Sequence, residues 1–273
     1  HSSFNLLGMF SPVKRGKSSP LTREALDLFG YQYNPYWGRQ MGDKRNSRNR
    51  VISEPIFVLS YNYLKNDTRL NIDLGYQFGE IGNTRIAYAN AQNPEPNYYK
   101  NMPSYYLNQN SGPDFAMAEE QKNYVLANSQ LNWENLYYAN YNNTDKHSTF
   151  IVSNDINRER TLSANFAMPI HDFIKWTSGV VYRNISSDNF AEIDDLLGGQ
   201  YFMNYDYFEN KPYDANEADM KKQKGDKWNY FYSLKSNVAE AFSQLEFTFK
   251  KAELFIAGRY HYTDVQREGK FNY

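Results

Sequence analysis

The strongest constraint on the fold is a strict alternation of apolar and polar side chains. Between Leu70 and Phe78 every second residue is apolar, and the residues between them are polar or glycine. Successive side chains of a β-strand point to opposite faces, whereas a helix would give a period of about 3.6 residues. The segment 68–79 is therefore predicted to be a strand with one apolar face.

The same pattern recurs along the chain and predicts seven strands joined as antiparallel hairpins. Their expected ranges are about 2–10, 52–64, 68–79, 147–168, 172–187, 228–249 and 252–268. Three connections are tight turns, at residues 65–67, 169–172 and 250–251. The other three are long, at roughly 11–51, 81–146 and 188–227.

Short and long connections alternate, which is typical of one class of β protein. In an up-and-down sheet the tight turns would share one end and the long loops the other. Soluble domains rarely carry loops of about forty residues, whereas transmembrane β-barrels have short turns at one end and long loops at the other. We therefore expect an all-β chain that forms an antiparallel transmembrane β-barrel segment with long extracellular loops. A soluble β-sandwich or an adhesin-like sheet is the competing interpretation.

The polar faces of the predicted strands are rich in charge. Their charged residues include Arg69, Asp73, Lys175, Arg183, Glu240, Glu246, Glu253 and Arg259. In a dry core each would cost several kcal/mol unless paired, but in a water-filled lumen the cost is small. Aromatic residues gather toward the ends of the apolar faces, where the aromatic girdle of a barrel would lie. These are Tyr61, Tyr63, Tyr76, Phe78, Phe247, Phe249, Tyr260 and Tyr262.

Two predicted strands are longer than a membrane requires. Segments 147–168 and 228–249 each hold about 20 residues, whereas a spanning strand needs about 9–11. The excess is expected to project beyond the bilayer on the side of the long loops.

Composition excludes several classes of function. The formal charge of −1 gives no basic field for nucleic acid, and the absence of cysteine excludes disulfides, thiolate zinc sites and thiol catalysis. The four histidines are far apart, and the chain lacks an HExxH, G-x-S-x-G or Walker motif. We therefore expect neither an enzyme nor a cofactor. Aromatic residues make up 17% of the chain, which argues against disorder.

Two stretches of sequence resemble a known family. Residues 34–48 read NPYWGRQMGDKRNSR and precede Glu54-Pro55, and residues 194–202 read DDLLGGQYF. Both are similar to segments of the large TonB-dependent outer-membrane receptors of Bacteroidota. The resemblance implies a barrel of about 22 strands in the bacterial outer membrane, with an N-terminal plug in its lumen. Residues 1–273 would then be part of one barrel domain, as an internal piece holding about seven strands, with the plug and the other strands outside this chain.

The resemblance implies two alternative functions. One is a transporter that binds a bulky nutrient (a glycan, a peptide or a metal chelate) at its outer loops and imports it. Its partners would be outer-membrane lipid, the TonB energy-transducing complex acting through the plug, and a surface lipoprotein capping the barrel. The other is a receptor-like barrel that serves as a structural subunit of a larger outer-membrane assembly for secretion or barrel insertion. A third hypothesis, independent of the resemblance, is a soluble β-rich binding or adhesion module.

The long loops supply the candidate binding residues. Segments 118–128 and 131–141 are predicted helices, with Asn128 or Asn132 as a cap of the second. Aromatic faces beside amides suit stacking on sugars or capture of a peptide, although they also suit packing between helices or against a partner. The candidates are Trp37, Tyr98, Tyr99, Trp133, Tyr137, Tyr138, Tyr201 and Tyr205.

Two charged clusters are interpreted as structural. The basic run 44–50 suits an anion, but it equally suits a loop tied to its neighbours or to the plug. The acidic residues between Asp194 and Asp219 have the oxygen ligands that calcium prefers, but they lack the spacing of an EF-hand. No metal site is therefore predicted.

Overall fold

The computed structural model describes residues 1–65, 68–167, 174–217 and 219–272. Seven long strands form the main sheet: β1 (Ser2–Met9), β6 (Ile56–Lys65), β7 (Thr68–Tyr88), β8 (Phe150–Ala167), β9 (Ile174–Asp195), β14 (Lys227–Thr248) and β15 (Glu253–Gly269). They lie side by side in the order β1-β6-β7-β8-β9-β14-β15, and every neighbouring pair is antiparallel. The prediction of an antiparallel all-β chain with seven main strands is thus confirmed.

Shorter elements complete the fold. The strands β2 (Val13–Gly16) and β5 (Asn49–Ser53) join the main sheet, and small hairpins are made by β3 (Trp37–Gln40) with β4 (Asp43–Asn46), β10 (Phe202–Met203) with β13 (Lys221–Lys222), and β11 (Tyr205–Asp206) with β12 (Lys211–Pro212). The helices are α1 (Arg23–Phe29), α2 (Pro103–Leu107), α3 (Phe115–Ala127) and α4 (Trp133–Tyr141), with a 3-10 turn η1 at Tyr99–Asn101. No helix in the described part of the chain is long and apolar enough to cross a membrane.

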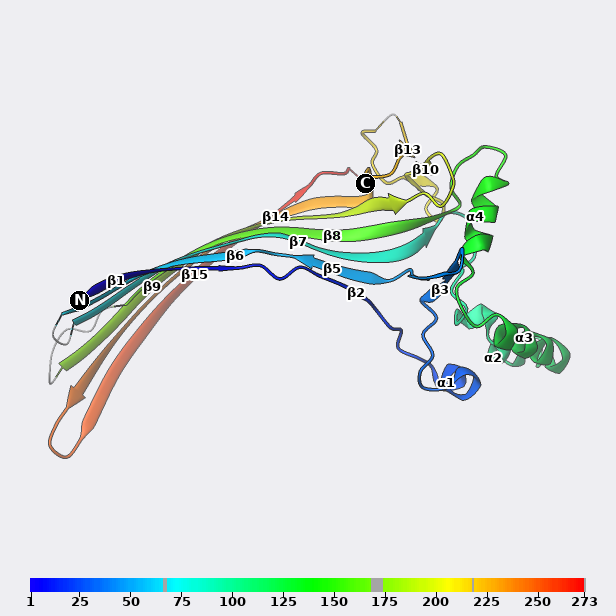
Figure 1. Ribbon diagram of the computed structural model, residues 1–273. Coiled ribbons are helices and arrows are strands. Elements are labelled where there is room, and N and C mark those ends of the chain that lie inside the picture. The colour runs from blue at the N-terminus through cyan, green and yellow to red at the C-terminus, as the bar shows by residue number, and fades with distance from the viewer. Residues whose placement is uncertain (66–67, 168–173, 218, 273) are drawn as a thin grey trace.

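The strands form one long curved sheet whose two ends differ (Figure 1). The hairpin between β14 and β15 turns at one end, and the helices and small hairpins gather at the other. Within the described residues β1 and β15 form the two outer edges and do not pair with each other, so the sheet is not a closed barrel. The predicted turn at 250–251 is confirmed, whereas the turns at 65–67 and 169–172 fall wholly or partly outside the described residues.

Several predicted boundaries were wrong. Strand β7 continues to Tyr88 instead of residue 79, and β9 continues to Asp195 instead of residue 187. Residues 11–51 are not all loop, because β2, α1, β3 and β4 lie within them and β5 begins at Asn49. The helices α3 and α4 occupy residues predicted to be helical, with Asn132 accepting a hydrogen bond from the Asn135 amide as the cap of α4. The short helices α1 and α2 were not predicted.

In the described residues near the tight turns, no helix or small hairpin packs on either face of the sheet. At the loop end both faces are covered. On one face Trp133 and Leu136 of α4 pack against Ile86 and Val152. On the other face, Phe202 and Trp228 pack with the buried side chains of the sheet. They cover Ala87, Ala89, Ile151, Ala191 and Ile193. Among the described residues the hydrophobic core therefore lies at the loop end, where it fixes the long connections to the strands.

One glycine lets β7 pass close to the junction of β5 and β6. Gly79 has φ +132°, a conformation that side chains disfavour, and a Cβ added there would lie 2.0 Å from the carbonyl oxygen of Ser53. Next to it, the Phe78 amide donates to the carbonyl of Pro55. Gly79 therefore marks the point at which the partner of β7 changes from β6 to β5.

Gly79→Ala is expected to destabilise the sheet by about 1–2 kcal/mol, because the new methyl group meets backbone on a constrained residue. The measurement is the guanidinium midpoint for unfolding of the protein. Gly258→Ala is the matched control, since nothing lies within 4 Å of a Cβ added there. Equal midpoints for the two variants would contradict the expected steric conflict.

Candidate functional site

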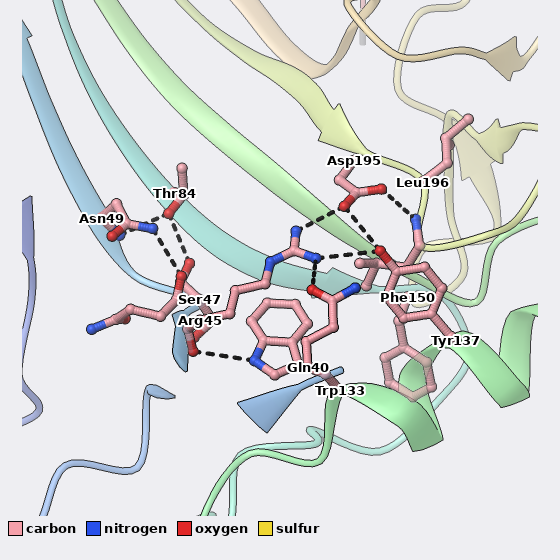
Figure 2. Close-up of polar contacts among 12 residues, drawn as sticks. Gln40, Arg45, Ser47, Asn49, Thr84, Trp133, Tyr137, Phe150, Asp195 and Leu196 are labelled. Carbon is pink, nitrogen blue, oxygen red and sulfur yellow. Dashed lines mark hydrogen bonds and ion pairs between the residues drawn. The ribbon is translucent and has the colours of Figure 1, made fainter. Parts of the chain in front are cut away.

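The loop end of the sheet carries a polar clamp built around Arg45. Its guanidinium donates to a carboxylate oxygen of Asp195 at 2.7 Å and to the side-chain oxygen of Gln40 at 2.8 Å (Figure 2). It also lies over the Trp133 ring at 4.1 Å and donates to the Tyr137 hydroxyl at 3.3 Å. One cation thus joins the β3–β4 hairpin, α4 and the end of β9.

The geometry of the clamp is fixed from several sides. The Trp133 side chain is fully buried, and its indole N–H donates to the carbonyl of Arg45. Gly38 of β3 runs so close that an added Cβ would lie 1.7 Å from the carbonyl oxygen of Leu131. The other carboxylate oxygen of Asp195 accepts from the Leu197 amide at 2.9 Å. The polar groups of the clamp are therefore already committed to one another.

The rest of the basic run is also occupied by internal contacts. Arg48 pairs with Glu95 at 2.7 Å and lies over the Tyr36 ring. Ser47 is fully buried, and its carbonyl accepts from the hydroxyl of Thr84 on β7. These contacts agree with the interpretation of residues 44–50 as a loop tied to its neighbours.

The side-chain amide of Asn140 anchors α4 to the sheet through hydrogen bonds made by both its nitrogen and its oxygen. Its nitrogen donates to the carbonyls of Phe150, Leu196 and Leu197, and its oxygen accepts from the amides of Thr149 and Phe150. The side chain is only 1% exposed. Since an amide offers two donors and one acceptor oxygen, little capacity is left for any other ligand.

The opposite face of the sheet bears an open cavity of about 680 Å³. Its floor includes Ala87 and Ala89, and its walls come from Trp228 and from the connection between β9 and β14. The aromatic side chains around it are Tyr88, Phe202, Tyr205, Tyr207, Phe208, Tyr213 and Trp228. This is the most aromatic hollow described in the chain, and it lies on the face that carries Arg85 and Asp155.

A second hollow of about 550 Å³ continues along the same face and includes Tyr230 and Tyr232 of β14. Asp155 connects the two hollows, because it pairs with Arg85 of the first at 3.0 Å and accepts from the Tyr230 hydroxyl at 3.3 Å. Burial, and then the Asp155 carboxylate, raise the pKa of Tyr230 above its ordinary value. The phenol therefore stays protonated and acts as the donor in this contact.

The predicted binding residues separate into two groups, of which the first is internal. Trp133 and Tyr137 belong to the Arg45 clamp, and Trp37 lies under the ammonium of Lys44 at 4.2 Å. Tyr201 lies under Lys221 at 4.9 Å. For these four residues the geometry favours the packing alternative over direct ligand binding.

The second group is accessible. Tyr98 and Tyr99 stack edge to face at 4.7 Å, and Tyr99 and Tyr138 are 58% and 72% exposed. Tyr205 lines the larger hollow and stacks edge to face on Tyr207. Of the eight candidates, Tyr205 alone lines the larger hollow. The strand residues Trp228 of this hollow and Tyr230 and Tyr232 of the second hollow were missed.

The acidic residues between β9 and β14 have local partners. Asp206 accepts from the amides of Phe208 and Glu209, Asp214 from the amide of Asn216, and Asp219 from the amide of Lys221. These carboxylates shape the turns of the connection, which accounts for their number without a cation.

Comparison of the chain with protein-family models, with curated proteins and with solved structures gives no match. The features that bear on function are therefore the two faces of the sheet and the hollows at the loop end.

Proposed function

We propose that this chain is part of the wall of an outer-membrane β-barrel receptor of the TonB-dependent type, which binds a bulky nutrient at its outer connections and imports it. The observation that carries this proposal is a band of apolar side chains on one face of the sheet. On β7, β9, β14 and β15 the band spans Leu70–Phe78, Ile174–Tyr182, Ala239–Phe247 and Leu254–Tyr262. Each stretch is nine residues long, and a strand that crosses a bilayer needs about 9–11.

The band shifts along the strands between β7 and β9 and then runs level to β15. Pairing connects Ile72 of β7, through Phe166, Val180 and Ala241, to Tyr260 of β15. Ile72 is the second band residue from the turn end of β7, whereas Tyr260 is the second from the loop end of β15. The whole four-residue displacement falls between β7 and β9, because the nine-residue stretches of β9, β14 and β15 pair residue for residue without a shift.

Polar groups within the band are satisfied inside the sheet. The Trp176 indole donates to the Ser243 hydroxyl at 2.7 Å, and the Ser178 hydroxyl donates to the carbonyl of Phe242 at 3.0 Å. Just above the band the same face turns polar, with Asn184 donating to Asn237 at 2.7 Å. This internal pairing is what hydrocarbon surroundings demand.

The other face at the same level carries paired charges. Glu240 accepts from Arg259 at 2.5 Å and from Arg183 at 3.3 Å, and Lys175 pairs with Glu246 at 3.2 Å. An apolar face backed by a charged face is the arrangement of a wall between lipid and a water-filled lumen. The aromatic hollows lie on this charged face, beyond the band, where a ligand would arrive from the lumen mouth.

A nitroxide scan of β15 tests this proposal. The chain has no cysteine, so each introduced cysteine is unique within it. In the vesicle-reconstituted protein, labels at Leu254, Ile256 and Tyr260 are expected to collide more with oxygen than with a water-soluble nickel complex. Labels at the alternate positions Ala257 and Arg259 should show the reverse preference. Equal preference for the two reagents at both sets of positions would contradict a membrane wall.

A second candidate function, a structural subunit of a larger outer-membrane assembly, is favoured by the position of α4. This helix packs on Ile86 and Val152, and Ile86 shares its face with the apolar band. Its exposed Tyr138 and Tyr141 therefore extend beside the wall and not over the charged face. Peptide mapping of the complete polypeptide separates the two functions, since transport requires a plug and a TonB box whereas a structural subunit does not.

A further inference from the structure

The two hollows on the charged face have linings that suit one kind of ligand. Ala87 at the end of β7, and Ala89 and Ala91 in the segment that follows it, line the larger hollow with small side chains. Rings stand around that space, with Tyr205 and Tyr207 edge to face at 5.2 Å, and Tyr230 and Tyr232 further along β14 at 6.1 Å. Aromatic rings placed in this way offer flat apolar faces with hydroxyl groups at their edges.

The charge at the larger hollow points to a neutral ligand. Its two charged lining residues, Arg85 and Asp206, have opposite signs. Arg85 is paired with Asp155, and Asp206 accepts from two backbone amides of its own turn. A metal chelate or polyanion would need uncommitted cationic groups, which recognise carboxylates and phosphates through charge-assisted hydrogen bonds. Beside the ring faces, the rim of the larger hollow carries the neutral side-chain amides of Asn90 and Gln92.

We infer that the two hollows form one track for a neutral oligosaccharide, whose sugar rings stack on Tyr207, Tyr205, Tyr230 and Tyr232. A pyranose ring has an apolar C–H face and a hydroxyl-bearing edge, which match the rings and the polar groups between them. The Arg85–Asp155–Tyr230 chain holds the two parts of the track together and presents hydroxyl and carboxylate oxygens to the sugar. This assignment rests on the proposed function and names its substrate class.

The test measures binding of purified, detergent-solubilised protein to a panel of probes. Cellohexaose, maltohexaose, xylohexaose and mannohexaose represent neutral chains, hexagalacturonate represents an acidic chain, and a casein digest represents peptides. At least one neutral hexaose is expected to bind. Tyr207→Ala and Tyr230→Ala should each weaken that binding about tenfold or more, as truncation of an aromatic anchor does. Tyr207→Phe should keep most of it, because the ring face remains.

Tyr141→Ala is the matched control, since Tyr141 is an exposed tyrosine on the other face of the sheet. It should leave binding unchanged. Failure of all four neutral hexaoses, binding of hexagalacturonate or casein peptides in their place, or equal loss in the track and control variants would overturn the assignment. The nitroxide scan of β15 reports on the membrane wall separately, so an absent sugar signal with an alternating scan rejects the track alone.

Discussion

Arg45→Ala is expected to lower the stability of the loop end by about 2–3 kcal/mol, because one cation makes four different contacts there. Removing it leaves the Asp195 carboxylate without its 2.7 Å partner and the Trp133 ring without its cover. Both side chains of the pair are about a quarter to a third exposed, so water replaces part of the lost interaction. The loss should concentrate on the β3–β4 hairpin and α4.

Hydrogen exchange of the folded protein measures this effect directly. Amides of α4 should exchange about 30-fold faster in Arg45→Ala, which corresponds to about 2 kcal/mol of opening free energy. Arg39→Ala is the control on the same hairpin, since Arg39 is exposed and its guanidinium donates to the carbonyl of Gly42. If both variants exchange at the rate of the unaltered protein, Arg45 does not clamp the junction.

The part of the sheet nearer the tight turns was predictable from sequence because its two faces differ in polarity. Apolar residues alternate with polar residues or glycine from Leu70 to Phe78, and this alternation is the signal that predicts the strand. Beyond Gly79 the signal ends although the strand continues. At Ile86 and Ala87 both faces are buried, so neighbouring residues on opposite faces are equally apolar. Phe190 and Ala191 are likewise buried on opposite faces, so the alternating pattern does not extend to the end of β9.

The sequence signals of the short helices α1 and α2 are weaker than those of the strands. Helix α1 has a Thr22 side chain that accepts from the Ala25 amide and a Gly30 that follows its last residue, which together mark its ends. Helix α2 begins with Pro103, the residue that favours the first helical position. Both helices are too short for an apolar period to show, so caps alone would have to identify them.

The candidate site depended on contacts that sequence spacing does not contain. Arg45 and Asp195 are 150 residues apart, and the sequence around either residue does not predict contact with the other. Trp133 and Tyr137 were chosen because they are aromatic residues in a loop, but one buries its ring under Arg45 and the other contacts Asp195. Trp228 was missed because it begins a predicted strand, whose side chains were assigned to the wall and not to a hollow.

The apolar band makes one further prediction, which distinguishes a membrane wall from a soluble sheet. Ile256 and Ala257 are neighbours on β15 whose side chains lie on opposite faces, and the Ile256 side chain is 61% exposed. In a bilayer Ile256→Lys is expected to cost about 2–4 kcal/mol of folding free energy, because the ammonium would enter hydrocarbon near the middle of the band. Ala257→Lys should change it by less than about 0.5 kcal/mol, because that face carries Arg259 and Glu240 in an aqueous lumen.

Guanidinium-dependent folding into lipid vesicles gives both values, and Ile256→Ala separates the charge from the loss of the isoleucine side chain. In a soluble sheet an isoleucine with this exposure could become lysine at little cost, since it would move from water to water. A large penalty at residue 256 with none at residue 257 therefore requires hydrocarbon on one face and water on the other. Equal small effects at both positions would contradict the membrane wall and therefore both the transporter and the subunit functions. The remaining interpretation would be a free-standing β-rich binding module.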